Sequence, residues 1–182
     1  SASEGFSRAN LGCSIAESLE RFEAVAARAN ADSVPMRGYV SCVTDCPYDG
    51  PVPVGSVARV VVSLFTMGCY EVSLGDTIGR GTPETVTDML DAVLNETAPE
   101  TLAGDFHDTS KRALENIGVS LERGLRVFDA SVSGLGGCPF APNASGNVAT
   151  RAVVMFVEAK NYETGVDRAA LHAAEVFVET AL

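Results

Sequence analysis

The chain has 182 residues, of which 46% are hydrophobic, and 24 acidic residues against 13 basic ones. This length and hydrophobicity suit one folded domain over residues 1–182 and argue against a disordered chain. The negative charge argues against nucleic acid and anionic membrane surfaces as partners, because both are bound by clustered Lys and Arg. No apolar run approaches the roughly 20 residues that span a bilayer, so we expect no membrane insertion.

The five cysteines are irregularly spaced, at positions 13, 42, 46, 69 and 138, and no pair has the C-x-x-C spacing of zinc and redox motifs. We therefore expect reduced thiols. Cys138 differs from the others because it lies in a glycine-rich loop rather than in an apolar element.

The first half of the chain alternates helix and strand patterns. Ser14 and Glu17 form a capping-box pattern, and the apolar residues after them recur on one helical face: Ile15, Leu19, Phe22, Ala26 and Ala29. A strand is predicted over 36–43, a turn-rich loop over 45–51, a helix over about 54–66 and a second strand over 69–74. Residues 75–79 form the turn that ends this strand.

The second half continues the alternation. Thr82-Pro83-Glu84 is a strong helix start, since it combines a cap residue, Pro at the first helical position and an acid at the positive end of the helix dipole. A third strand is predicted over 102–106, and a helix capped by Asp108 or Thr109 should follow and end at Gly124. A fourth strand over 126–132 and helices near 150–159 and 167–181 complete the pattern.

Four βα units in series predict an α/β fold with parallel strands and right-handed crossovers. Polar residues gather directly after each predicted strand, at the edge where parallel α/β folds place their sites. Four strands could form an open sheet or half of a barrel, since a complete (β/α)8 barrel typically needs about 250 residues.

Three segments suggest a divalent metal bound by imidazole and oxygen ligands beside a thiol-bearing loop: His107, Asn147 and the run Gly134-Leu135-Gly136-Gly137-Cys138-Pro139. Several of the polar residues named so far could instead have purely structural roles. His107 could be a capping or core histidine, and Asp76 could satisfy backbone donors in a tight turn. The glycine run could be a plain connection. His172, on a predicted helix, is expected to face solvent or to pack, and not to be a metal ligand. Arg151 could contact an anionic ligand or pair with a nearby acid, and we expect the pairing.

The chain resembles the 3-hydroxy-3-methylglutaryl-CoA lyase family over nearly its whole length. The Gly-Leu-Gly-Gly-Cys-Pro loop is the most specific match, and the other matching segments are residues 1–4, 37–42, 46–48, 68–79, 106–109 and 144–147.

The resemblance implies a metal-dependent TIM barrel that cleaves a 3-hydroxyacyl-CoA into acetyl-CoA and acetoacetate by a retro-Claisen reaction. It implies Mg or Mn as the metal, with His107 and Asn147 as ligands. Cys138 would assist proton transfer at the departing enolate, held in the loop of Gly134, Gly136 and Gly137. Asp76 matches an acid that lines the site.

The chain departs from the family pattern at two places. The family has His-x-His at the end of the third predicted strand, and here Asp105 replaces the first histidine; a carboxylate can also bind Mg or Mn. The family's strand-one Arg-Asp motif, with its metal ligand, and its strand-two glutamate have no counterpart. By the resemblance, the chain supplies strands five to eight of the barrel.

Two functional hypotheses follow. The chain is half of a working lyase, completed by another chain or an N-terminal half that covers the open side of the barrel, or it is a catalytically degenerate structural subunit of a larger assembly. Both require a partner surface, since a half barrel exposes strand edges, and in both the isolated chain is expected to be inactive. A third hypothesis, a binding module, predicts acyl-CoA affinity without turnover. The family implies the mitochondrial matrix, or the cytoplasm of a bacterium.

Overall fold

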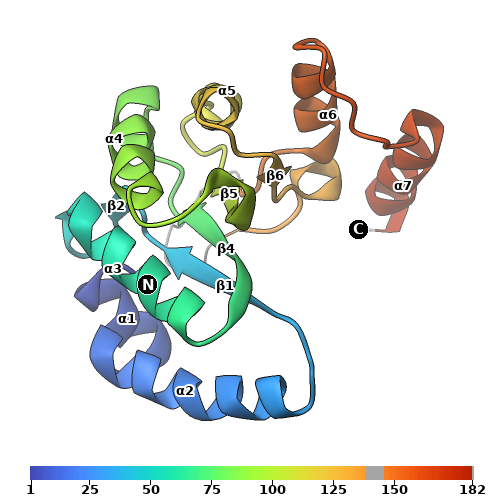
Figure 1. Cartoon of the computed structure of the whole chain (residues 1–182). Coiled ribbons are helices and arrows are strands. Elements are labelled where there is room, and N and C mark those ends of the chain that lie inside the picture. The colour runs from blue at the N-terminus through green and yellow to red at the C-terminus, as the bar shows by residue number, and fades with distance from the viewer. Residues whose placement is uncertain (138–145, 182) are drawn as a thin grey trace.

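The computed structural model describes residues 1–137 and 146–181. Its centre is a sheet of four parallel strands in the order β1-β4-β5-β6 (Figure 1). The strands are β1 (Met36–Ser41), β4 (Cys69–Asp76), β5 (Leu102–Phe106) and β6 (Val127–Phe128). A small antiparallel pair, β2 (Asp45–Cys46) with β3 (Gly50–Pro51), follows β1.

Helices connect the strands in sequence and form one layer over the sheet (Figure 1). Two helices precede β1: α1 (Glu4–Leu11) and α2 (Ile15–Ala31). Each crossover contains one α-helix: α3 (Val54–Thr66), α4 (Pro83–Leu94) and α5 (Ala113–Glu122). The 3-10 turn η1 (Pro99–Thr101) lies between α4 and β5. After β6 come the 3-10 turn η2 (Val132–Gly134), α6 (Thr150–Glu158) and α7 (Arg168–Ala181). Within the part of the chain described, no helix is long and apolar enough to cross a bilayer.

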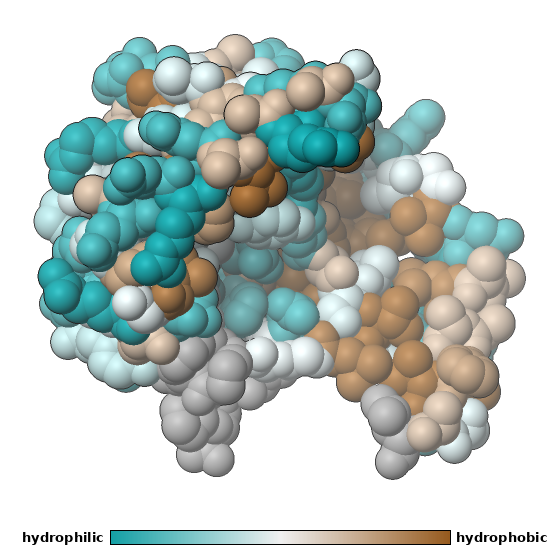
Figure 2. Space-filling model, turned by 90° about the horizontal axis from the view of Figure 1, so that it is seen from below, coloured by the Kyte–Doolittle hydropathy of each residue, from teal (hydrophilic) through white to brown (hydrophobic). Residues whose placement is uncertain are grey.

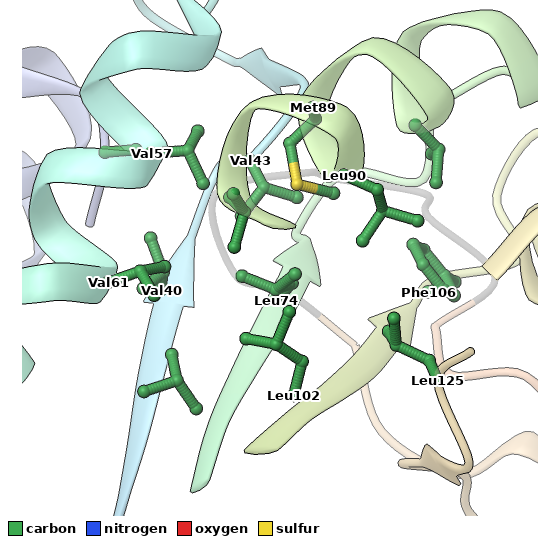
Figure 3. Close-up of a cluster of buried hydrophobic side chains, with 14 of the residues drawn as sticks. Val40, Val43, Val57, Val61, Leu74, Met89, Leu90, Leu102, Phe106 and Leu125 are labelled. Atoms are coloured by element: carbon green, nitrogen blue, oxygen red, sulfur yellow. The ribbon is translucent and has the colours of Figure 1, made fainter. Parts of the chain in front are cut away.

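The hydrophobic core lies between the sheet and this helical layer (Figure 3). Alternate strand residues point toward the helices because side chains along a strand alternate between its two faces. Buried strand side chains such as Leu74, Leu102 and Phe106 meet Val61 of α3 and Leu90 of α4. The other face of the sheet is left to the polar residues of the intervening positions.

The predicted α/β fold with parallel strands is confirmed, but two strand boundaries were wrong. The strand predicted over 36–43 ends at Ser41, because Cys42 adopts a left-handed φ of 59° and its N–H donates to Thr77 Oγ1 at 2.8 Å. The strand predicted over 126–132 pairs only at Val127–Phe128, since the chain then turns toward η2. By contrast, β4 continues beyond the predicted residue 74 to Asp76.

Two helix predictions also need correction. The helix expected to be capped by Asp108 or Thr109 begins at Ala113 with Arg112 as its N-cap residue. Asp108 still satisfies a backbone donor of the first turn of this helix, because its Oδ1 accepts a hydrogen bond from the Ala113 N–H at 3.2 Å. Helix α1 was not predicted; its N-cap Ser3 accepts a hydrogen bond from the Phe6 N–H.

The capping box predicted at the start of α2 is present, and a second one opens α4, where Thr82 Oγ1 accepts from the Thr85 N–H. We expect Thr82→Ala to lower the free energy of unfolding by about 1 kcal/mol, because the first turn of α4 loses a hydrogen-bond acceptor. Denaturant titration followed by circular dichroism measures this loss. Thr66→Ala, at the exposed end of α3, serves as the control, and an equal loss in both variants would contradict the capping argument.

Candidate active site on the inner face of the sheet

The face of the sheet opposite the helices is polar. Its charged side chains are one guanidinium and three carboxylates, contributed by different strands: Arg37 of β1, Glu71 of β4, Asp105 of β5 and Asp129 directly after β6. The molecule is hollowed, and hydrophobic residues gather on the side of the hollow that contains the C-terminal elements (Figure 2). A cation would therefore find an excess of negative charge on this face.

Arg37 spans the inner face from β1 to the residue that follows β6. It forms ion pairs with Glu71 and, at 2.9 Å, with Asp129, whose Oδ2 also accepts from Ser73 Oγ at 2.7 Å. Burial opposes the charge of Arg37, but the hydrogen bonds to Asp129 and Glu71 outweigh it and raise its pKa. These bonds fix the positions of Glu71 and Asp129. Among the described residues, Asp105 is the carboxylate of this face that pairs with no guanidinium.

Asp105 and His107 lie two residues apart at the carboxyl end of β5 and so extend to the same face. Asp105 Oδ1 is 4.0 Å from His107 Nε2, too far for a hydrogen bond. Burial raises the pKa of Asp105, and nearby Asp129 adds to that effect while His107 opposes it. The side chain of His107 is only 12% exposed, and its Nδ1 has no hydrogen-bond partner among the described residues.

Asn147 is brought beside His107 although forty residues separate them in the chain. The two residues form an isolated antiparallel bridge, and the Asp108 N–H donates to Gly146 O at 3.0 Å. The Asn147 side chain holds the start of the glycine-rich segment, since its Nδ2 donates to Leu135 O at 2.8 Å. Gly136 is required there, because its φ is 102° and a Cβ would lie 2.8 Å from that same amide nitrogen.

Asp76 is fully buried at the end of β4. Its carboxylate accepts hydrogen bonds from Thr44 Oγ1 at 3.0 Å and from the N–H groups of Arg80 and Gly81 at 3.2 and 2.8 Å. Burial raises its pKa, and these three donors act against the rise. In this geometry Asp76 satisfies the backbone donors of the turn after β4, which is the structural role considered from the sequence. The catalytic role implied by the resemblance stays a prediction.

The remaining predicted residues are placed as follows. Cys138 lies outside the described residues. Gly134 and Gly137 belong to the described part of the glycine-rich segment that precedes it. The four other cysteines are free thiols, as expected. His172 is exposed, and Arg151 pairs with Glu175, both as predicted.

The residues present suit a divalent cation in part. Asp105, His107 and Asn147 offer carboxylate, imidazole and amide donors at one end of the sheet. The buried Nδ1 of His107 has no hydrogen-bond partner among the described residues, so it is available to a ligand. The described residues contain no cluster of three or more His, Cys, Asp or Glu side chains that could hold a metal by themselves. A complete coordination shell therefore needs the Asn147 amide and further ligands.

Comparison with known proteins settles the family. A family model described as HMGL-like matches residues 1–178. The chain belongs to the HMGL-like family. It is 53% identical over 178 residues to the mitochondrial hydroxymethylglutaryl-CoA lyase of Arabidopsis thaliana and 51% identical over 182 residues to the cytoplasmic 3-hydroxy-3-methylglutaryl-CoA lyase of Danio rerio. These matches cover 98% and 100% of this chain but 38% and 54% of the relatives.

The fold is shared with a solved HMGL-like structure. The HMG-CoA lyase of Brucella melitensis superposes with a TM-score of 0.96 at 60% identity, covering 99% of this chain and 64% of that one. The prediction of part of a TIM barrel from this lyase family is thereby confirmed. The chain spans roughly four to six tenths of the length of these relatives. Nothing in these comparisons supports a degenerate, purely structural role.

Sequence reasoning missed the charged network of Arg37, Glu71 and Asp129. A signal was present, because Arg37, Tyr39 and Ser41 alternate with small or apolar residues along β1. Alternation of this kind marks a second, polar face of the strand. The partners of Arg37 could not be identified, since they depend on which strands are neighbours.

Proposed function

We propose that this chain provides the second half of a hydroxymethylglutaryl-CoA lyase barrel and that, with a complementary half, it cleaves 3-hydroxy-3-methylglutaryl-CoA. The observation that supports this most is the convergence of Asp105, His107 and Asn147 at one end of the sheet in a member of the HMGL-like family. As implied by its fold family, catalytic residues belong at the carboxyl ends of the strands.

A divalent cation, Mg or Mn, would be held by Asp105, His107 and Asn147, with the remaining ligands from the complementary half or from substrate. When bound, such an ion supplies Lewis acidity toward the oxygens of the substrate. Arg37 keeps Asp129 and Glu71 in fixed ion pairs, and thereby leaves Asp105 as the carboxylate available to a cation.

The reaction itself is a redistribution within one molecule. The C3 hydroxyl gives its proton to a base that the complementary half is proposed to supply, the C2–C3 bond breaks as the C3 carbonyl of acetoacetate forms, and the electron pair of that bond passes to the acetyl-CoA enolate. Cys138, on the loop whose start Asn147 holds at Leu135, is proposed to deliver the proton that the enolate carbon takes up.

The complementary half is proposed to add strands at both edges of the sheet, β1 and β6. At the β1 edge the Ala2 N–H already donates to Ser41 O at 2.9 Å, so the start of the chain lies against the end of that strand. A cavity of about 360 Å³ between α2 and β1 is lined by apolar side chains that include Phe22 and Val25, which are 40% and 63% exposed. A neighbouring strand would bury them.

The test of the cation site is calorimetric titration of the 182-residue chain with Mn²⁺. We expect His107→Ala to weaken Mn²⁺ binding at least about tenfold, because it removes an imidazole ligand. His172→Ala is the matched control, since that histidine is exposed on α7 and should leave the affinity unchanged. Equal affinities for the wild type and His107→Ala would exclude His107 as a ligand.

A second titration examines Asp105. Replacing it by His restores the family's His-x-His pattern and should tighten Mn²⁺ binding, because His107 then has the partner ligand that the family has at this position. Binding of CoA without any turnover, by the chain reconstituted with its complementary half, would instead favour the ligand-binding alternative.

We further propose that the chain works in the mitochondrial matrix if its source is eukaryotic and in the cytoplasm if it is bacterial. The mitochondrial lyase of Arabidopsis thaliana supports the first location, and the existence of a bacterial relative in Brucella melitensis supports the second. The cytoplasmic lyase of Danio rerio is a eukaryotic relative outside this division.

A further inference from the structure

The C-terminal helix α7 is attached to the rest of the molecule by few apolar contacts. Its buried residues are Leu171 and Glu175, while Phe177 is 71% exposed. Both α7 and α6 contact η2, the 3-10 turn from which the glycine-rich segment continues. With a single buried apolar side chain, α7 depends on polar contacts to hold its place.

The main polar contact of α7 is an ion pair with α6. Arg151 Nε lies 2.9 and 2.7 Å from the two carboxylate oxygens of Glu175, and its Nη2 also donates to Oε2. The Glu175 side chain is only 12% exposed. Arg151 lowers the pKa of Glu175, which identifies the pair as favourable in the folded chain. His172, 3.8 Å from Glu175 Oε2, is a weaker neighbour.

Arg151 is the second residue of α6, and the chain just before it is bonded to the base of the glycine-rich segment. The Ser131 N–H donates to Val148 O at 3.1 Å, and the Thr150 N–H donates to Ser131 O at 2.9 Å. Ser131 immediately precedes η2, and Asn147 immediately precedes Val148. The ion pair therefore lies beside the backbone hydrogen bonds that join Ser131, at the start of η2, to Val148 and Thr150, at the start of α6.

We propose that Arg151 and Glu175 are positioning residues whose ion pair clamps α7 and α6 onto η2, and so fixes the base of the glycine-rich segment and the backbone of Asn147. The consequence for catalysis rests on the proposed function; the clamp itself does not. Breaking the pair releases α7 from η2, so that the backbone amides near Ser131 and Val148 become less protected from hydrogen exchange.

A second ion pair between the same two helices provides a matched control. Arg168, the first residue of α7, pairs with Glu158, the last residue of α6, and the two side chains are 64% and 24% exposed. This pair lies at the opposite end of α6 from Arg151, roughly 10 Å along the helix axis. It can hold the helices together, but it does not act on η2.

Amide hydrogen exchange of the 182-residue chain tests the proposal. In Arg151→Gln we expect exchange in residues 131–137 and 147–149 to become roughly tenfold faster, with β4 unchanged, because only a local opening is made easier. The charge-reversed double variant Arg151→Glu with Glu175→Arg should bring the rates back toward those of the wild type. Arg168→Gln should leave these segments unaffected.

The proposal is overturned if Arg151→Gln leaves exchange at 131–137 unchanged, or if Arg168→Gln accelerates it equally. Should Arg151→Gln unfold the whole chain, so that β4 also exchanges faster, Arg151→Lys replaces it: the charge stays, the two-pronged geometry is lost, and a smaller local increase is expected. A local effect in these variants together with no Mn²⁺ binding at His107 would retain the clamp and refute the metal site.

Discussion

Asp76→Ala should lower the free energy of unfolding by about 3 kcal/mol or more, because it removes the acceptor of three hydrogen bonds from inside the protein. The two backbone donors, Arg80 and Gly81, would be left with a void where the carboxylate was. Urea denaturation measures the loss. Asp88→Ala, at an exposed position of α4, is the control and should change the stability little.

The pH dependence of Asp76→Asn distinguishes the charge from the hydrogen bonds. Since burial raises the pKa of Asp76 in the folded state, ionisation of this group favours the unfolded chain. The stability advantage of the wild type over Asp76→Asn should be largest below about pH 4 and should shrink as the pH rises through the folded-state pKa. An advantage that grows with pH would show that the buried carboxylate is stabilised as the anion.

Arg37→Met should destabilise the chain by about 2 to 3 kcal/mol, because it leaves Glu71 and Asp129 without their shared guanidinium. The value lies below that for a fully buried pair, since the side chain of Asp129 is 31% exposed and keeps its bond from Ser73. Thermal or urea unfolding provides the measurement.

Arg28→Met is the matched control for Arg37. Arg28 also pairs with an aspartate, Asp32, but the two side chains are 80% and 49% exposed, so its loss should cost less than about 1 kcal/mol. If both substitutions cost the same, the network on the inner face contributes no more than a surface pair.

The elements that the sequence predicted well are those with local causes. The start of α4 follows from Thr82 and Pro83, and the start of α2 from Ser14 and Glu17, since cap, ring and dipole act within one turn. The predicted boundaries were wrong where contacts with residues distant in the sequence determine the end of an element. Strand β1 ends early because the Cys42 N–H bonds to Thr77, a residue on another crossover, and no local pattern announces that.

The candidate site likewise has features that the sequence predicts and features that depend on contacts between distant residues. The grouping of polar residues after each strand followed from parallel topology, and the residue types of His107 and Asn147 suggested a shared metal site. The backbone bridge between them joins segments forty residues apart, so no local pattern could predict it. The network of Arg37 needed the sheet order β1-β4-β5-β6, because its reach to Asp129 crosses two intervening strands. Alternation identified the polar face but not its pairings.

The most direct test of the half-barrel account is an assay of hydroxymethylglutaryl-CoA cleavage by this chain alone and after co-expression with the N-terminal half of the Brucella melitensis lyase, whose fold it matches with a TM-score of 0.96. We predict no measurable cleavage by the chain alone and at least about a hundredfold higher rate in the reconstituted pair, because the proposed cation site takes its ligands from both halves. A monomeric preparation of this chain that cleaves the thioester as fast as the pair would contradict the account.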